Sequence, residues 1–265
     1  MSFISLKNIT FAYPNGHTAV ENVSMEIGKG ETVAIVGQNG AGKTTAVKLM
    51  NGLLKPTKGD VIIDDWNTKE HTTAQISRKV GYVFQNPDDQ IFHSDVYSEV
   101  EFGPKNLGLS VEQTKENVMK AAKLAGIEPY LQENPYNLPY SMRKFVTMAA
   151  VVAMDCDVII LDEPTAGQDM QGMQRISSLI AALKSEGKTV ITITHDMEFV
   201  VQNFERVIVM AHKNVVADTN KRDIFWNHAI LEESMLKQPH ISRLSHTLGL
   251  PKQILTIEEF VETML

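Results

Sequence analysis

Residues 37–45 read Gly-Gln-Asn-Gly-Ala-Gly-Lys-Thr-Thr and directly follow the apolar segment Thr32-Val33-Ala34-Ile35-Val36. A GxxxxGK[ST] pattern between a strand and a helix is typical of a loop that binds phosphate. Its glycines let the backbone curl so that N–H groups point inward, and a helix beginning near Lys43 adds the positive end of its dipole. A glycine-rich turn without a ligand is the plainer interpretation, but the flanking strand and helix favour phosphate binding.

The loop predicts a nucleoside triphosphate as its ligand, with Mg²⁺ as the accompanying ion. Lys43 is expected to reach the β- and γ-phosphates, and the Thr44 hydroxyl to bind the ion. The residues expected to surround the phosphates are Gly37, Gln38, Asn39, Gly40, Ala41, Gly42, Lys43, Thr44 and Thr45.

A second motif, Val158-Ile159-Ile160-Leu161-Asp162-Glu163-Pro164, is an apolar run that ends in two acids. Four consecutive apolar residues suit a central parallel strand, and ligands bind at the carboxyl ends of such strands. We therefore expect Asp162 to organise Mg²⁺, often through a water, and Glu163 to orient and deprotonate an attacking water. Two acids capping a turn are a common alternative, which the phosphate loop upstream disfavours.

The composition limits the classes of function. The chain has 265 residues and a net charge of −7, which argues against broad nucleic-acid binding and against a polybasic lipid anchor. Its one cysteine, Cys156, is expected to be a packing residue in a reducing compartment. No signal-peptide pattern is visible, and the apolar stretches 145–154 and 158–161 fall short of the ~18 residues of a membrane span. The sequence predicts a cytoplasmic protein that can still dock on a membrane protein.

The order of predicted elements indicates an α/β fold. The first thirty residues alternate as antiparallel strands with a small irregularity, residues 96–154 are mainly helical, and strands alternate with helices from 158 to 210. This pattern predicts a mixed-to-parallel sheet with an antiparallel β subdomain and a helical subdomain. We expect one ATPase domain over residues 1–227 and a helical C-terminal extension over 228–265.

The order of motifs resembles that of ATP-binding cassette (ABC) ATPases over essentially residues 1–225. Beyond the loop and the two acids, it rests on Gln85 in Tyr82-Val83-Phe84-Gln85-Asn86-Pro87 and on His195 in Ile193-Thr194-His195-Asp196. The resemblance implies a P-loop NTPase of ABC type that hydrolyses ATP with Mg²⁺. It implies that Gln85 ligates Mg²⁺ and transmits contact with a membrane subunit, and that His195 touches the γ-phosphate. Tyr13, in Phe11-Ala12-Tyr13-Pro14, takes the place of the ring that stacks on adenine, although such a ring is more often packing.

Two further stretches resemble one branch of that family. Residues 85–92, Gln-Asn-Pro-Asp-Asp-Gln-Ile-Phe, and 100–104, Val-Glu-Phe-Gly-Pro, look like the ATPases of energy-coupling factor (ECF) transporters, which drive uptake of vitamins or transition-metal ions. The tail from Leu236 to Thr256 resembles their C-terminal extension, although an appendage that covers a sheet edge is the alternative. The resemblance implies a peripheral protein on the cytoplasmic face of the membrane, with a transmembrane coupling subunit and a substrate-binding membrane subunit as partners and no nucleic acid.

The chain departs from the family at the signature segment. Where the family has Leu-Ser-Gly-Gly-Gln, this chain reads Leu138-Pro139-Tyr140-Ser141-Met142, followed by a predicted helix over 143–154. A two-residue shift of the alignment would let Ser141 take the serine's place, but the glycines, which permit close approach to a phosphate, are lost in either alignment. Gln168 also stands where leucine is usual. Because each family site joins one chain's phosphate loop to the other chain's signature, we predict a heterodimer with a second ATPase whose signature is intact.

Three other functions agree less well with the sequence. A soluble ABC ATPase of DNA repair or translation usually carries a coiled-coil insertion or a second cassette, and neither is present. A nucleotide-binding regulatory subunit that hydrolyses nothing would explain the altered signature but not the intact Glu163 and His195. An unrelated P-loop kinase or GTPase is disfavoured because no guanine-recognition motif is apparent.

Overall fold

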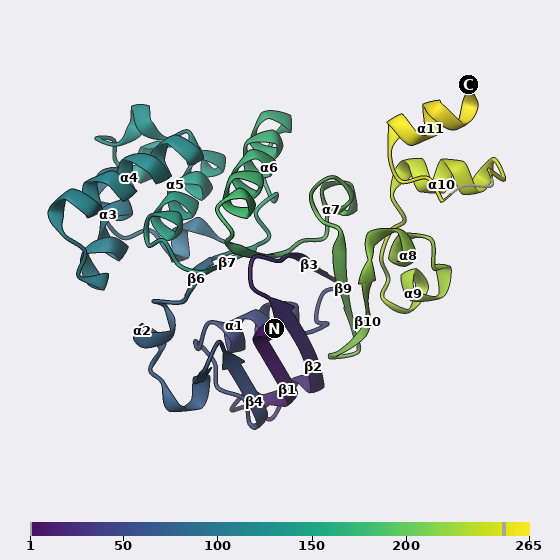
Figure 1. The fold of residues 1–265 in the computed structure, drawn as a ribbon, viewed down its shortest axis with the longest axis horizontal. Helices are drawn as coiled ribbons and strands as arrows, with labels where there is room; N and C mark the ends of the chain where they lie inside the picture. Colours follow the sequence, from purple (N-terminus) through teal and green to yellow (C-terminus); the bar gives the residue numbers. More distant parts are fainter. Residues whose placement is uncertain (1, 251–252) are drawn as a thin grey trace.

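The computed structural model describes residues 2–250 and 253–265 (Figure 1). Its strands are β1 (Ser2–Ala12), β2 (Thr18–Gly28), β3 (Thr32–Val36), β4 (Lys58–Ile63), β5 (Trp66–Asn67), β6 (Val80–Val83), β7 (Val158–Asp162), β8 (Thr189–Ile193), β9 (Arg206–Ala211) and β10 (Asn214–Asn220). Its helices are α1 (Lys43–Met50), α2 (Thr73–Ile76), α3 (Val96–Leu107), α4 (Val111–Ala125), α5 (Tyr140–Ala153), α6 (Met170–Ser185), α7 (Met197–Asn203), α8 (Lys221–Phe225), α9 (His228–Glu233), α10 (His240–Thr247) and α11 (Ile257–Met264).

The central sheet has the strand order β10-β9-β3-β8-β7-β6. Its strands from β9 to β6 run parallel, and β10 pairs antiparallel to β9 at the edge. In β3, β7 and β8 every residue is buried, as expected for parallel strands covered on both faces.

Alternate residues of these strands enter two separate cores. Leu161 and Val36 belong to the core under helices α3 to α7, whereas Ile160 and Ile35 belong to the core shared with β1, β2, β4 and α1. The chain therefore folds in layers, with helices α3 to α7 above the central sheet and the antiparallel strands and α1 below it (Figure 1).

The predicted antiparallel strands and their irregularity are confirmed. The second sheet has the order β2-β1-β4-β5, and the pairing of β1 with β2 shifts register between Leu6 and Ile9. Asn8 lies in this bulge with a φ of 50°, a conformation that asparagine tolerates better than most residues.

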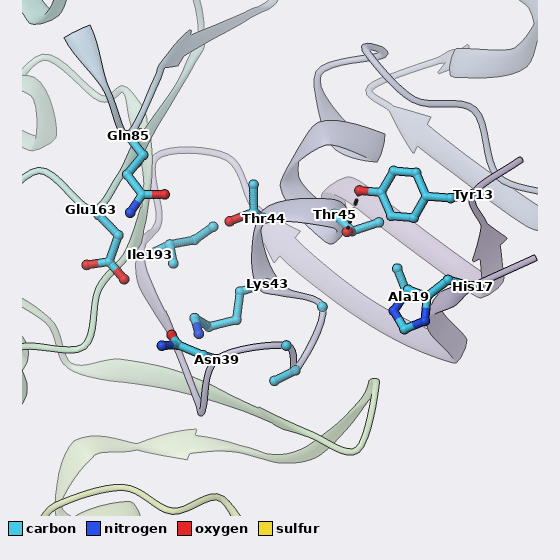
Figure 2. Close-up of a pocket in the computed structure, with 13 residues that line it drawn as sticks. Tyr13, His17, Ala19, Asn39, Lys43, Thr44, Thr45, Gln85, Glu163 and Ile193 are labelled. Carbon is cyan, nitrogen blue, oxygen red and sulfur yellow. Dashed lines mark hydrogen bonds between the residues drawn. The ribbon is translucent and has the colours of Figure 1, made fainter. Parts of the chain in front are cut away.

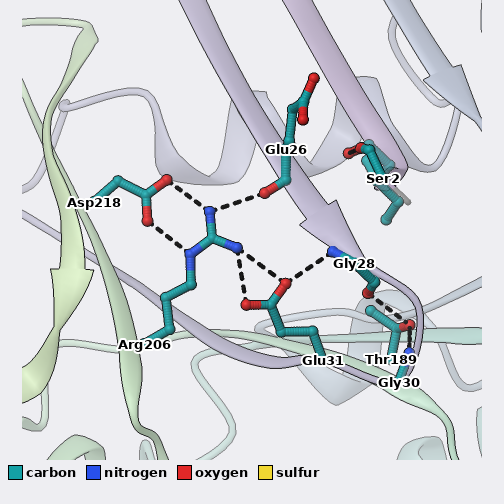
Figure 3. Close-up of polar contacts among 9 residues, drawn as sticks. Ser2, Glu26, Gly28, Gly30, Glu31, Thr189, Arg206 and Asp218 are labelled. Carbon is teal, nitrogen blue, oxygen red and sulfur yellow. Dashed lines mark hydrogen bonds and ion pairs between the residues drawn. The ribbon is translucent and has the colours of Figure 1, made fainter.

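Half-buried ion pairs around Arg206, together with one hydrogen bond to a backbone carbonyl of β2, connect the edge of the central sheet to the antiparallel strands (Figure 3). The Arg206 guanidinium donates two hydrogen bonds of 2.7 Å to Asp218 and two of 2.9 Å to Glu31. It also donates to the carbonyl of Glu26 at 2.8 Å. These contacts raise the pKa of Arg206 through hydrogen bonding to Asp218, although burial opposes them.

Some expected boundaries were wrong. Helix α5 begins at Tyr140 rather than at Arg143, so Tyr140, Ser141 and Met142 form its first turn. It begins there because Pro139 at the N-cap disfavours helical backbone at the preceding residue, Leu138, which is extended. Strand β10 was not predicted, since its residues are only half-buried and mostly polar.

The tail over residues 228–265 contains α9, α10 and α11; α9 lies near β10, whereas α10 and α11 lie farther from the sheet (Figure 1). The division at residues 227/228 and the helical subdomain over 96–154 stay predictions. Within the part of the chain that the structure describes, no helix is long and apolar enough to span a membrane.

Candidate nucleotide-binding site

The predicted site residues gather at one edge of the central sheet. The phosphate loop follows β3, His195 follows β8, Asp162 ends β7 and Gln85 follows β6. These four parallel strands are neighbours in the sheet, so their carboxyl ends bring the residues together although up to 158 positions separate them in sequence.

Two glycines of the loop occupy places that no other residue fits. At Gly37, which has a φ of 144°, an added Cβ would lie 2.0 Å from the Met210 carbonyl oxygen. At Gly42, with a φ of 98°, the Cβ would lie 2.6 Å from the Ala19 carbonyl oxygen. The loop backbone therefore packs closely against β9 and β2, and only glycine can adopt these conformations without a clash of its side chain.

Lys43 is held inside the curl of the loop. Its ammonium donates to the carbonyls of Gly37 at 2.7 Å and Gln38 at 3.0 Å, and the residue is only 8% exposed. Burial lowers the pKa of Lys43, and the carboxylates of Glu163 and Asp162 partly offset this effect. A cation in this position can bind an anionic ligand in the space beside it.

A cavity of about 230 Å³ opens beside the loop (Figure 2). Glu163 and Gln85 lie on one side of Lys43, and Tyr13 and His17 lie on the other. Its lining contains ten of the predicted site residues: Tyr13, Asn39, Gly40, Ala41, Gly42, Lys43, Thr44, Thr45, Gln85 and Glu163. His17, Ala19 and Ile193 also line it, whereas Gly37, Gln38, Asp162 and His195 do not.

Asp162 is buried behind this cavity, with 1% of its surface exposed. Its Oδ2 accepts a hydrogen bond of 2.7 Å from the Tyr82 hydroxyl, and burial next to this carboxylate raises the pKa of Tyr82. Within the described residues Oδ1 makes no hydrogen bond. A buried carboxylate oxygen without a donor is a suitable acceptor for a water bound to a cation, so the residues fit the expected Mg²⁺.

Three polar groups of Glu163 have partners. Its Oε2 lies 2.8 Å from Nδ1 of His195, its backbone N–H donates to the Ile193 carbonyl at 2.9 Å, and its own carbonyl accepts from the Lys144 ammonium at 2.6 Å. Its φ of 49° is unusual for a residue with a side chain. The carboxylate therefore reaches the cavity from a fixed, left-handed turn.

Tyr13 stands at the far end of the cavity from Glu163 (Figure 2). Its hydroxyl lies 3.2 Å from the Thr45 Oγ1, and its ring packs edge-on against Phe11 with the centroids 5.0 Å apart. The ring is half-buried, so one surface is available to a flat ligand.

The altered signature segment packs against the loop that follows Glu163. The Gln168 amide donates to the Ser141 carbonyl at 3.1 Å. The Tyr140 ring packs against Gly167, since a Cβ added to Gly167 would lie 3.4 Å from the ring. Two departures from the family pattern, at residues 141 and 168, are therefore in contact with each other.

Sequence reasoning missed Tyr82 and Lys144. Tyr82 stands in the sequence motif only as a neighbour of Gln85. In the sheet it pairs with Ile160 and shares its face, and Asp162, two residues after Ile160, lies on that same face. Lys144 lies one turn before Met148 on the buried stripe of α5. A charged residue on an apolar stripe is the signal that could have identified it.

The fold and the site together define a P-loop nucleotide-binding protein. A sequence model of the ABC transporter family matches residues 20–166. The chain is 39% identical over 274 residues to the energy-coupling factor transporter ATP-binding protein EcfA1 of Caldanaerobacter subterraneus, covering 99% of each. The chain therefore belongs to the ABC transporter family, whose members bind and hydrolyse ATP, and it is the ATPase of a transporter.

Solved structures agree with this assignment. CbiO1 from Clostridium perfringens, described as part of the ABC transporter complex CbiONQ, superposes with a TM-score of 0.79 at 31% identity, covering 94% of this chain and 99% of the other. A dimeric ATP-binding cassette bound to ADP and Pi in a post-hydrolysis state gives a TM-score of 0.74 at 28% identity over 82% of this chain and 98% of the other. The predicted α/β fold of ABC type is confirmed.

Proposed function

We propose that this chain hydrolyses Mg²⁺-bound ATP at the cavity beside residues 37–45, with Glu163 as the base. The observation that carries this proposal is the position of the Glu163 carboxylate, which lines the same cavity as Lys43 and Thr44 and is oriented by His195. Base and phosphate-binding cation thus line one small cavity, and the orienting group contacts the base.

The reaction would be the transfer of the γ-phosphoryl group to water. Lys43 exchanges the carbonyls of Gly37 and Gln38 for phosphate oxygens, and the loop N–H groups share the negative charge. Glu163 accepts the proton of the attacking water, while His195 fixes its carboxylate and contacts the γ-phosphate. Gln85 faces the phosphate end of the cavity, and Tyr13 stacks on adenine at the other end.

Asp162, Thr44 and Gln85 would hold the Mg²⁺ ion. When bound, the ion neutralises charge that develops on the phosphate oxygens. The buried Oδ1 of Asp162 supplies a strong acceptor for a water of the ion, and Tyr82 fixes the orientation of that carboxylate.

We further infer that the chain works as one half of a heterodimer. Its Tyr140 and Ser141 side chains lie in the first turn of α5, where the family has glycines that approach the partner's ATP. Loss of one well-placed donor to a transition-state oxygen costs ~10²–10³ in rate. A partner ATPase with an intact signature would complete the site built on Lys43 and Glu163.

The transporter is proposed to be of ECF type and to take up a vitamin or a transition-metal ion, with this chain bound peripherally at the cytoplasmic face of the membrane. The similarity to EcfA1 over 99% of both chains supports this, as does the likeness to CbiO1. The expected partners are a second ATPase, a transmembrane coupling subunit and a substrate-binding membrane subunit, with no nucleic acid involved.

Glu163→Gln tests the catalytic proposal. The substitution keeps the shape of the side chain and removes the base, so ATP binding should persist within about twofold while hydrolysis falls by on the order of 10²-fold or more. The complex is purified from membranes through a tag on this chain, ATP turnover and ATP retention are measured, and the co-purified proteins are identified. Wild-type turnover by the variant would contradict the role of Glu163, and brisk hydrolysis by a homodimer of this chain would contradict the heterodimer.

A further inference from the structure

Lys144 is a fully buried charge beside the proposed base. Only 1% of its surface is exposed, and it is among the largest side chains buried to this degree in the part of the chain that the structure describes. Its ammonium donates to the carbonyl oxygen of Glu163 at 2.6 Å. Since a buried ammonium costs several kcal/mol unless it is well compensated, its retention in the core calls for an explanation.

The contact fixes the backbone of Glu163. The residue has a φ of 49°, and left-handed backbone costs a non-glycine residue roughly 1–2 kcal/mol. Its N–H is tied to Ile193, and the Ala166 N–H reaches its carbonyl only at 3.4 Å. The Lys144 ammonium is therefore the closest donor to this carbonyl, and it anchors the turn that aims the carboxylate at the cavity.

Lys144 also connects two functional segments. It lies one turn into α5, two residues after the segment Leu138–Met142, and reaches from there to the end of β7. The ammonium is also close to the negative charges of Glu163 and Asp162, which partly offset the desolvation that lowers its pKa to about 8. A neutral side chain would leave both acids with less compensation.

We propose that Lys144 is a positioning residue for ATP hydrolysis, holding Glu163 in the left-handed turn from which its carboxylate can activate water. This inference rests on the proposed role of Glu163 as the base. It predicts that Lys144 acts on the chemical step through Glu163 and leaves nucleotide affinity nearly unchanged.

The test compares Lys144→Met, Lys144→Arg and Lys221→Met in the membrane complex purified through this chain. Lys221→Met is the matched control, because the Lys221 ammonium also donates to a backbone carbonyl, that of Val201 at 2.8 Å, but on the far helix α8. We expect Lys144→Met to lower kcat for ATP about tenfold or more with KM within twofold, Lys144→Arg to restore part of the loss, and Lys221→Met to behave as wild type.

A double-mutant cycle separates positioning from a general effect on folding. If Lys144 acts through Glu163, adding Lys144→Met to Glu163→Gln should not slow single-turnover hydrolysis further. A multiplied loss would show a separate, structural role and overturn the inference. If Lys144→Met does not fold, Lys144→Gln, which stays polar but removes the charge and shortens the side chain, replaces it in the same cycle with the same expectation.

The two proposals fail in different ways. Wild-type kcat in Lys144→Met together with an inactive Glu163→Gln overturns the role of Lys144 alone. Wild-type kcat in Glu163→Gln overturns the proposed base, and with it the reason for positioning it.

Discussion

The hydrogen bond between Tyr82 and Asp162 offers a quantitative test of the site. Asp162 is 1% exposed, its Oδ2 has the Tyr82 hydroxyl at 2.7 Å, and its Oδ1 has no partner within the described residues. Tyr82→Phe keeps the ring and removes the one side-chain donor that this carboxylate has among residues 2–250 and 253–265. A hydrogen bond to a charged group contributes about 1.5–3 kcal/mol, so the free energy of unfolding should fall by about that amount. For a chain of this size the melting temperature should fall by roughly 3–12 °C.

The assay is urea and thermal unfolding of the full chain with EDTA and without nucleotide, since a cation on Asp162 would mask the loss. Tyr136→Phe is the control, because it removes a hydroxyl that donates to the neutral carbonyl of Ile91 at 2.8 Å from a ring that is 47% exposed. It should cost less than about 1 kcal/mol. Equal losses in the two variants, within ~0.5 kcal/mol, would refute the idea that Tyr82 compensates a buried carboxylate.

Two other predictions concern packing and protonation. Gly37→Ala should lower the free energy of unfolding of the nucleotide-free chain by about 2 kcal/mol more than Gly40→Ala. Both glycines have positive φ, but only a Cβ on Gly37 would clash with a carbonyl oxygen, at 2.0 Å. Equal losses of the two variants in urea unfolding would contradict this close approach. Burial raises the pKa of Cys156 to about 12 from 9.0, so the native state binds more protons than the unfolded state between these values. The stability that the buried Cys156 thiol contributes is present below pH 9 and is lost as the pH rises towards 12. At pH 10 the free energy of unfolding of the wild type should therefore have fallen by about 1.4 kcal/mol relative to that of Cys156→Ala. Parallel pH profiles of stability for the two proteins would contradict this.

The parts of the site that the sequence revealed are those whose geometry is local or follows from sheet topology. The loop at 37–45 carries its own conformation, since its glycines sit where a side chain cannot. Asp162, Gln85 and His195 could be grouped because each ends or follows a strand, and parallel strands place such ends along one edge. The predicted assembly of these residues needed no knowledge of side-chain packing.

Tyr82 and Lys144 could not be found in that way, because their roles depend on contacts between distant elements. Tyr82 meets Asp162 only because β6 pairs with β7 in the register that sets it opposite Ile160. The position of Lys144 depends on how α5 packs above the end of β7, and on the helix beginning at Tyr140 instead of Arg143. Neither register nor helix phase is fixed by a motif.

The altered signature segment is best understood together with residue 168. Gln168 donates to the Ser141 carbonyl, and Tyr140 packs on the φ-positive Gly167, so the first turn of α5 and the loop after Glu163 support each other within one chain. Changing Gln168 to the leucine usual in the family would remove the amide from that carbonyl, and changing Tyr140 to glycine would remove the ring that covers Gly167. Either change alone disturbs a contact that this chain has in place of the family pattern. Because the Glu163 turn lies between Lys144 and this loop, a family-type signature would have to be introduced as a unit, with residues 139–142 and 168 exchanged together.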